Sequence, residues 1–229
     1  MDFQKVTAVA TRRGIFQPAF DAYGGLAGFY DYGPVGVRMR RRILEVWRKH
    51  YIIDAGCLEL DGALIGPETL FQASGHLGEF DDALVDCPDC GKQFRADHLV
   101  EGGDALTRED LAKAVSKTTC PNCGAELSEL KAFNLMFSTG VGSGRGAPGY
   151  LRPETAQSIF LAFPWLLRQN RGKLPFAGAQ IGRAFRNEIS PRQGPLRMRE
   201  FTQMEVEHFF LPGDEPGLSD SLKKVKISL

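Results

Sequence analysis

Two short cysteine repeats are the first residues whose type and spacing could do chemistry. Cys87-Pro-Asp-Cys90-Gly and Cys120-Pro-Asn-Cys123-Gly are nearly identical, and each is a C-x-x-C-G unit. Four thiolates suit the tetrahedral geometry of a structural zinc site. Four cysteines would also leave no open coordination position, so the predicted metal is structural and not catalytic. The alternatives are free thiols or a redox pair, which two matching units make a poorer explanation.

A second set of chemical groups follows two segments that favour β-strands, at 178–189 and 199–210. Because strand side chains alternate between faces with period two, one face of this predicted hairpin collects charged and aromatic groups. The opposite face of the second strand, with Met204, Val206 and Phe210, suits a core. The charged face carries Arg186, Glu188, Phe201, Gln203, Glu205, Glu207 and Phe209.

The connection between these strands adds more positive charge. It contributes Arg192, Arg197 and Arg199, which together could neutralise a polyanion such as a triphosphate. An ordinary solvated sheet face is the alternative interpretation of this pattern. A mixture of three glutamates, an arginine and two phenylalanines is unusual for such a surface, so the pattern favours a binding site.

Helices are expected on both sides of these groups. Pro34 is a good first-turn residue, and apolar residues at helical spacing predict a helix over 35–53 that ends at Gly56. A strand is predicted from Cys57 to Ile65. The lone Cys57 is interpreted as a small buried apolar residue. The apolar positions of the predicted helix are Met39, Ile43, Val46, Trp47 and Tyr51.

A further helix is predicted from Pro153 to about Gln169, with a kink or a local break at Pro164. The glycine-rich segment 140–149 lacks the Gly-Lys-Ser/Thr of a phosphate-binding loop, and we expect it to be a mobile loop. The change of character over 81–132, which holds the cysteine pairs and a polar helix near 107–117, indicates an insertion. We therefore divide the chain into core segments 1–80 and 133–211, the insertion 81–132, and a tail at 212–229 without interpretable motifs.

Composition sets the broad class. The 229 residues are 43% hydrophobic and 24% charged, which is close to the globular norm. The formal net charge is +0, so any contact with nucleic acid must come from local patches. The chain shows no signal-like apolar run at its start and no apolar stretch of the length that a membrane span needs. A cytoplasmic protein with no membrane contact is expected.

Longer motifs carry a family resemblance. Arg186-Asn-Glu188 followed by Arg197-x-x-x-Phe201 resembles motif 2 of the class II aminoacyl-tRNA synthetases. The wider amino-acid sequence is similar to glycyl-tRNA synthetases, and the matching segments extend from about residue 12 to 210. The matching segments are Tyr23-Gly-Gly, Tyr30-Asp-Tyr-Gly-Pro34, Ser74-Gly-His76, Leu151-Arg-Pro-Glu-Thr-Ala-Gln157, Phe185-Arg-Asn-Glu-Ile-Ser-Pro-Arg192 and Arg199-Glu-Phe-Thr-Gln-Met-Glu-Val-Glu207.

The resemblance implies roles for six residues. Arg186 matches the catalytic arginine that holds the α-phosphate and the amino-acid carboxylate. Glu188 matches the residue beside the adenine amino group, Arg197 the contact to the γ-phosphate, and Phe201 the residue stacked on adenine. Two further carboxylates, Glu154 and Glu205, match residues that receive the ammonium group of glycine. Glu154 alone would be interpreted as an ordinary dipole partner in the first turn of a helix.

The resemblance also implies a fold, a reaction and partners. The fold is a mixed α+β (α/β) class II synthetase-like core, an antiparallel sheet flanked by helices, with a zinc-binding insertion. The reaction is that of a glycine–tRNA ligase, an aminoacyl-tRNA ligase that joins glycine to ATP with Mg²⁺ as glycyl-adenylate and then transfers glycine to tRNA-Gly. The helix at 35–53, the strand after it and Pro67 resemble motif 1, which implies a homodimer. His76 is the histidine with the best case for an active-site role.

One departure from the family stands at the end of the sequence. Motif 3 and an anticodon-binding domain are not found, so we expect this chain alone not to charge tRNA at a useful rate. Two other functions stay open. One is a non-catalytic synthetase-like fragment that binds nucleic acid or a partner, and the other is a metal-dependent ligase that serves a non-tRNA acceptor.

Overall fold

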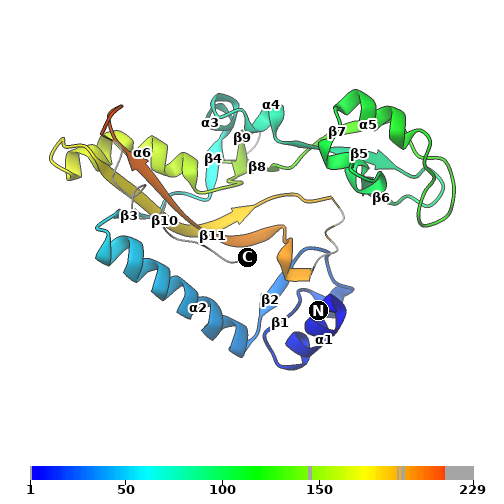
Figure 1. Cartoon of the computed structure of the whole chain (residues 1–229), viewed down its shortest axis with the longest axis horizontal. Coiled ribbons are helices and arrows are strands. Elements are labelled where there is room, and N and C mark those ends of the chain that lie inside the picture. The colour runs from blue at the N-terminus through cyan, green and yellow to red at the C-terminus, as the bar shows by residue number, and fades with distance from the viewer. Residues whose placement is uncertain (1, 144–145, 190, 192–193, 215–229) are drawn as a thin grey trace. The chain divides into compact units, whose positions relative to one another are not determined.

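The computed structural model describes residues 2–143, 146–189, 191 and 194–214 (Figure 1). The predicted contact Arg192 and the tail from 215 onward lie outside these residues. The described chain divides into two compact units, and each is described by itself. Unit 1 holds 1–38, 64–153 and 184–201, and unit 2 holds 39–63, 154–183 and 202–229.

Unit 1 begins with helix α1 (Phe3–Arg12) and a small sheet in which β1 (Phe16–Pro18) pairs antiparallel with β2 (Tyr30–Tyr32). The side chain of Asp2 caps α1 by accepting hydrogen bonds from the backbone amides of Gln4 and Lys5, at 3.1 and 3.4 Å. Between the two strands lies the glycine-rich run, with the short 3-10 helix η1 (Asp21–Tyr23). Gly28 there has φ +79°, and a Cβ at this position would lie 2.6 Å from Pro191 Cγ, so only glycine fits.

A three-stranded antiparallel sheet of order β4-β9-β8 follows in unit 1 (Figure 1). The expectation of a mobile loop over 140–149 is wrong at residues 140–141 and 147–149, because β8 and β9 pair in register there, with Thr139 opposite Gly149 and Gly140 opposite Pro148. Glycine and proline have low strand propensities, so the sequence does not indicate a strand here. The hydrogen bonds between the two strands need only backbone groups and form nevertheless. The members of this layer are β4 (Ile65–Pro67), α3 (Glu68–Ala73), α4 (His76–Glu79), β8 (Phe137–Val141) and β9 (Ala147–Leu151).

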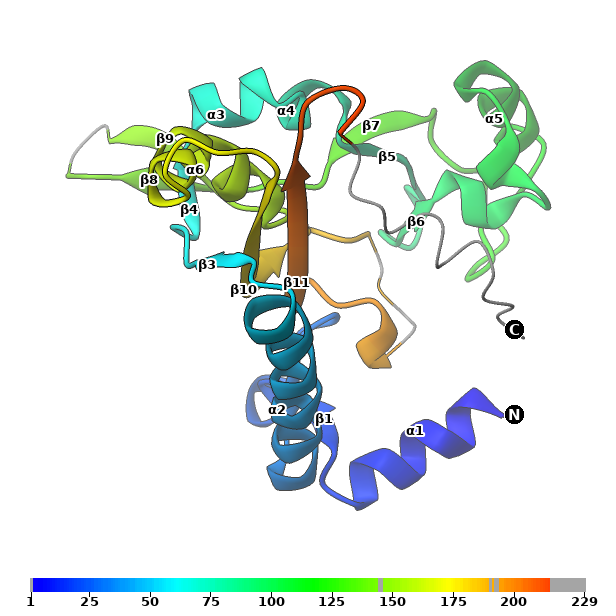
Figure 2. The same ribbon diagram turned by 60° about the vertical axis from the view of Figure 1, so that its left-hand side comes forward.

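The segment predicted to be an insertion forms its own antiparallel sheet of order β6-β5-β7 with helix α5 beside it (Figures 1 and 2). Its core contains Val85, Phe94, Leu111 and Val115, each of which is almost fully buried. Burying side chains of this kind contributes about 1.5–3 kcal/mol each. The elements are β5 (Asp81–Asp86), β6 (Gln93–Arg95), η3 (Ala96–Leu99), η4 (Gly103–Ala105), α5 (Arg108–Val115) and β7 (Lys131–Asn134).

The expected polar helix near 107–117 is confirmed by α5. The hydroxyl of Thr107 caps it by accepting a hydrogen bond from the amide of Asp110 at 3.3 Å. Glu109 and Asp110 lie in its first turn, where carboxylates stabilise the positive end of the helix dipole.

Three elements contain residues of both units: α2 (Pro34–Arg48), β10 (Phe176–Phe185) and β11 (Glu200–Phe209). The first confirms the predicted helix after Pro34, which continues as a π-helix, η2 (Lys49–Asp54). Its apolar positions divide between two environments. Trp47 and Tyr51 pack against the buried Cys57, Ala177 and Ala179, whereas Met39, Ile43 and Val46 are exposed.

Unit 2 carries the sheet of order β11-β10-β3, in which β3 (Leu58–Leu60) pairs in parallel with β10. The single strand predicted over Cys57–Ile65 is therefore wrong. The chain leaves β3 at Asp61-Gly62, and the next strand, β4, belongs to another sheet. Gly62 allows this departure, since a Cβ there would lie 2.4 Å from Ser158 Oγ.

Helix α6 (Ala156–Gln169) covers β10 within unit 2. It begins three residues later than predicted and continues through Pro164 without a break in its assignment. Gly178 lies against it, because a Cβ at this position would lie 2.7 Å from Ile159 Cγ2. The late start places Glu154 before the helix, so the dipole interpretation of this glutamate in a first helical turn is wrong.

The two strands of the predicted hairpin are confirmed with different bounds: β10 begins two residues and ends four residues earlier than predicted, and β11 is one residue shorter at each end. β10 ends at Phe185, so Arg186 and Glu188 lie in the segment after the strand and not on its face. The predicted division of β11 into a charged face and a core face is only partly right. Val206 packs on the core, but His208 and Phe210 are exposed, and Phe209 packs against Phe160, Phe163 and Phe176.

Candidate functional sites

The four cysteine sulfurs of the insertion meet at one point. Their Sγ atoms all lie within 4.8 Å of one another, with Cys87 and Cys123 at 3.4 Å and Cys90 and Cys120 at 3.7 Å. A tetrahedral site with metal–sulfur bonds of about 2.3 Å has sulfur–sulfur edges of about 3.8 Å, so the cluster has the dimensions of such a site.

Backbone amides support anionic sulfurs at two of the four cysteines, Cys90 and Cys120. At Cys123 the backbone hydrogen bond at Ala125 lowers the pKa, but hydrogen bonds with the neighbouring thiols and burial outweigh it, and the net pKa is raised. The backbone hydrogen bond at Lys92 is the largest cause that lowers the pKa of Cys90, to about 6. The amide of Asn122 lies 3.4 Å from Cys120 Sγ and opposes the burial that raises the pKa of this thiol, and the net pKa is lowered. Because a metal binds thiolates and not thiols, these amides favour the ligating form.

Arg186 is held from three sides within unit 1. Its Nε donates a hydrogen bond to the carbonyl of Pro153 at 3.1 Å. Its guanidinium carbon lies 5.4 Å from the ring centroids of both Phe80 and Phe201. Two aromatic faces and a carbonyl fix the position of the cation.

Phe80 was missed by the sequence argument. No motif marks it, because its role depends on a contact with a residue more than one hundred positions away. Its ring also lies 5.3 Å from the His76 ring, and both residues line a small cavity of about 180 Å³ with Ser74, Gly75 and Glu79. His76 thus lies next to a residue that contacts Arg186, and His76 Nδ1 is 2.9 Å from Ser74 Oγ.

Glu188 and Arg197 also come together in unit 1. Glu188 is 7% exposed, and its Oε2 lies 3.6 Å from Arg197 Nε. Arg199 donates two hydrogen bonds to the main-chain carbonyl of Glu188, at 2.8 and 3.1 Å, and one to the carbonyl of Ala27 at 2.9 Å. Burial lowers the pKa of Arg199 and the charge of Glu188 opposes that shift. The buried carboxylate of Glu188, with two arginines beside it, is therefore a hydrogen-bond acceptor whose position is fixed.

Three carboxylates gather in unit 2. Glu205 accepts a hydrogen bond from the buried Thr155 hydroxyl, and Glu154 accepts one from Gln157. Desolvation raises the pKa of Glu207, and the charges of Glu205 and Glu154 add to the effect. Three neighbouring carboxylates, one of them Glu207 with a raised pKa, form a site that favours a cation.

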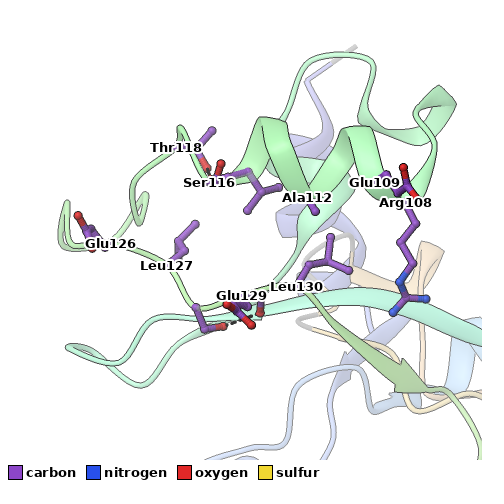
Figure 3. A pocket seen from close by; sticks show the side chains of 11 residues that line it. Arg108, Glu109, Ala112, Ser116, Thr118, Glu126, Leu127, Glu129 and Leu130 are labelled. Atoms are coloured by element: carbon purple, nitrogen blue, oxygen red, sulfur yellow. Dashed lines mark hydrogen bonds between the residues drawn. The ribbon is translucent and has the colours of Figure 1, made fainter.

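The structure therefore brings together Arg186 with Phe201, Glu188 with Arg197, and Glu154 with Glu205. The convergence of these sets on one cleft stays a prediction. A different cavity, of about 860 Å³, lies between α5 and the segment 126–130 (Figure 3). Glu109, Glu126 and Glu129 line it together with a single arginine, Arg108. This net negative charge makes the cavity unsuitable for a polyanion.

Comparisons with known proteins place these features in a class. Residues 145–228 match the family described as tRNA synthetase class II core domain (G, H, P, S and T). The fold is similar to the RNA-binding domain of a threonyl-tRNA synthetase from Cryptosporidium parvum Iowa II, with a TM-score of 0.56 at 18% identity over 90% of this chain and 37% of that one. A prolyl-tRNA synthetase from Cryptosporidium parvum gives a TM-score of 0.53 at 13% identity, over 89% of this chain and 28% of that one. The mixed α/β class II synthetase fold is thus confirmed.

The chain is also similar in sequence to curated glycine–tRNA ligases. The chain is 52% identical over 216 residues to a glycine–tRNA ligase from Methanothrix thermoacetophila and 46% identical over 217 residues to one from Methanocaldococcus jannaschii. Each match covers 92% of this chain but only 37% and 38% of the relative. The sequence is homologous to glycine–tRNA ligases over nine tenths of its length, and it spans little more than a third of theirs. Within the described residues, no helix is long and apolar enough to cross a membrane.

Proposed function

We propose that this chain supplies the ATP- and glycine-binding part of a glycine–tRNA ligase, which activates glycine as glycyl-adenylate for transfer to tRNA-Gly. The single observation that carries the proposal is the fixed position of Arg186 between Phe80 and Phe201, with Glu188 and Arg197 paired beside it. The similarity to glycine–tRNA ligases supports the choice of substrate.

In the proposed reaction, a carboxylate oxygen of glycine attacks the α-phosphorus of ATP, a new oxygen–phosphorus bond forms, and the bond to pyrophosphate breaks. The nucleophile is the substrate itself. The protein therefore contributes by positioning the two substrates and by neutralising the charge of the phosphates. Arg186 can donate to the α-phosphate and the glycine carboxylate at once, because its guanidinium is a planar fork of donors. Arg197 would meet the γ-phosphate, and Mg²⁺ would accompany the triphosphate as its counter-ion.

Two other contacts would select the substrates. Glu188 would accept a hydrogen bond from the adenine amino group, and the ring of Phe201 would stack on adenine. Glu154 and Glu205 would receive the ammonium group of glycine, with Glu207 adding negative charge. Carboxylates that line the pocket would leave little room for a larger side chain.

The cysteine cluster is proposed to hold one structural zinc through Cys87, Cys90, Cys120 and Cys123. The sulfur distances and the amides at Cys90 and Cys120 support it. When bound, the metal would cross-link the two turns that carry the cysteine pairs. Four thiolate ligands would leave the metal no coordination position for water or a substrate, so its role would be structural.

We also propose that the chain forms a homodimer through the exposed apolar stripe of Met39, Ile43 and Val46 on α2. Three apolar side chains on one helix face are typical of a surface that another chain covers. Sedimentation analysis should show a dimer that Ile43→Glu converts to a monomer. A monomeric wild-type chain would reject this part of the proposal.

Glycine-dependent exchange of pyrophosphate into ATP tests the proposed reaction. We expect exchange that requires glycine, that is much slower than exchange by a full-length relative, and that disappears in Arg186→Ala, measured together with ATP binding by calorimetry. Binding of ATP without any exchange would favour a non-catalytic role for this part of the chain. Exchange that another amino acid supports equally well would contradict glycine specificity.

A further inference from the structure

Three rings of unit 1 lie in a row that ends at Arg186. The ring centroids of Phe71 and His76 are 6.3 Å apart, and those of His76 and Phe80 are 5.3 Å apart. The guanidinium carbon of Arg186 lies 5.4 Å from the centroid of the Phe80 ring. Rings and cations at these separations are in contact. A single side chain, that of Phe80, therefore connects His76 with Arg186.

The His76 ring is held by groups other than Phe80. Its Nδ1 atom and the hydroxyl of Ser74 are joined by a hydrogen bond of 2.9 Å. Phe71, which is only 1% exposed, packs edge-on against the ring, with an angle of 78° between the two planes. The main chain of His76 is fixed as well, because the side-chain amide of Asn134 donates a hydrogen bond to its carbonyl at 2.9 Å. The ring thus has little freedom to turn.

Phe80 has a fixed backbone, but one side of its ring is open. Its carbonyl accepts a hydrogen bond from the amide of Leu135 at 3.0 Å. The cavity of about 180 Å³ borders its side chain, and an empty space offers no contact that could hold a ring in place. His76 precedes Phe80 by four residues, a spacing that puts both side chains on one face of a helical turn. The position of the Phe80 ring therefore depends on His76.

Arg186 in turn depends on Phe80. Its guanidinium lies over the rings of Phe80 and Phe201, and its Nε donates to the carbonyl of Pro153. If the Phe80 ring turned into the cavity, Arg186 would keep one ring and one hydrogen bond and would be free to shift. A displacement of about 1 Å is enough to weaken a contact to a reacting group strongly.

We propose that His76 is a positioning residue for the contact between Arg186 and the α-phosphate. It holds the Phe80 ring against the guanidinium, and Ser74 fixes His76 for this task. His76 itself touches no reacting atom. The inference rests on the proposed function, since it presupposes that Arg186 binds the α-phosphate.

Adenosine monophosphate (AMP) and adenosine separate this role from a general structural one. The two ligands differ only in the α-phosphate, so the ratio of their affinities measures the contact with that group, whereas a loss of folding weakens both. In ligand-observed NMR titrations, His76→Leu should lower the ratio of AMP to adenosine affinity by about threefold, within the range of a cation–π contact. His76→Phe, which keeps a ring beside Phe80, should restore most of the ratio. A ratio in His76→Phe as low as in His76→Leu would contradict the role of the ring.

A double-mutant cycle tests whether His76 acts through Phe80. Once Phe80→Leu has removed the ring, adding His76→Leu should not lower the ratio further. Additive losses would show that His76 acts by another route and would overturn the proposal. If His76→Leu does not fold, as judged by its melting temperature, His76→Asn keeps a partner for Ser74 without the ring and carries the same prediction.

A matched control is His98→Leu. His98 is an exposed histidine whose Nε2 atom lies 4.0 Å from Asp97 Oδ2. This substitution should leave the ratio of AMP to adenosine affinity unchanged. An equal loss in His98→Leu and His76→Leu would remove the case for a specific role of His76.

Arg186→Ala distinguishes failure of this inference from failure of the proposed function. If Arg186→Ala lowers the ratio and His76→Leu does not, or if His76→Leu weakens both ligands equally, the role of His76 is overturned while the phosphate contact stands. If the wild-type chain binds neither ligand, shows no preference for AMP, or keeps its preference in Arg186→Ala, the phosphate contact and the role of His76 are overturned together.

Discussion

The cysteine insertion and the Arg186 segment are stabilised in opposite ways. The four sulfurs come from two short turns, and the core beneath them is built from residues 85–115 of the same segment. Arg186 to Arg199 instead depend on distant parts of the chain, namely Ala27, Gly28, Phe80, Leu135 and Pro153. The insertion is thus a local structure, and the proposed nucleotide site is a product of long-range contacts.

The largest expected effect is loss of the metal. Cys90→Ser should release zinc and unfold the insertion, because structural zinc contributes about 10–16 kcal/mol to folding in small metal-binding domains. Elemental analysis should show about one zinc per chain in the wild type. The zinc content of Cys90→Ser should be well below that. Hydrogen exchange should show loss of protection in β5 to β7.

Cys57→Ala is the matched control, since Cys57 is buried outside the cluster. It should keep the zinc. A zinc-free wild-type chain with a fully protected insertion would show that packing alone holds this region.

The next effect concerns the long-range site. Arg186→Ala should lower ATP affinity by about a hundredfold, because removing one partner of a fixed charge contact costs about 2–5 kcal/mol. Calorimetric titration measures the ATP affinity. Arg42→Ala is the control, because Arg42 is an exposed arginine that pairs with Glu45 at 3.8 Å. Equal ATP affinity in Arg186→Ala and wild type would contradict the assignment of Arg186.

A smaller effect is expected at Phe80. Phe80→Leu keeps apolar volume but removes the ring face under Arg186, and cation–π contacts contribute about 0.5–2 kcal/mol. ATP affinity should fall about fivefold, whereas Phe20→Leu at an exposed aromatic position should not change it. If Phe80→Leu weakens ATP binding no more than Phe20→Leu does, the long-range support of Arg186 is weaker than the geometry indicates.

The smallest effect is a pH dependence in the acidic site. The raised pKa of Glu207 means that the folded state binds a proton more tightly than the unfolded state. Stability should therefore fall as pH rises above the ordinary glutamate value. Glu207→Gln should raise the melting temperature by a few degrees at pH 8, on the order of 1 kcal/mol, and by much less at pH 4, where the carboxyl is mostly protonated in both states. A rise of the same size at both pH values would exclude this cause.

The same contrast explains what the sequence could predict. Cys87, Cys90, Cys120 and Cys123 are recognisable because their spacing is itself the structural signal. The helix after Pro34 and the two strands around 178 and 206 are periodic and were found. The β8–β9 hairpin was not, because Gly140, Pro148 and Gly149 read as loop residues although their backbones form a ladder.

Contacts across the chain were beyond the sequence argument. Phe80 belongs to no motif, and only folding brings it near Arg186. The end of β10 at Phe185 also escaped prediction, so a period-two argument placed Arg186 and Glu188 on a strand face. The roles of the site residues came from the family resemblance and not from periodicity.

The most direct test of the central claim is a titration with a stable analogue of glycyl-adenylate, in which a sulfamoyl group replaces the phosphate. One molecule should bind per chain, and the alanyl analogue should bind at least tenfold more weakly, since one added methylene is worth about 1–3 kcal/mol in a fitted pocket. Glu205→Gln should weaken the glycyl analogue, and Arg186→Ala should abolish its binding. Equal affinity for the glycyl and alanyl analogues, or binding that Arg186→Ala leaves intact, would contradict the account.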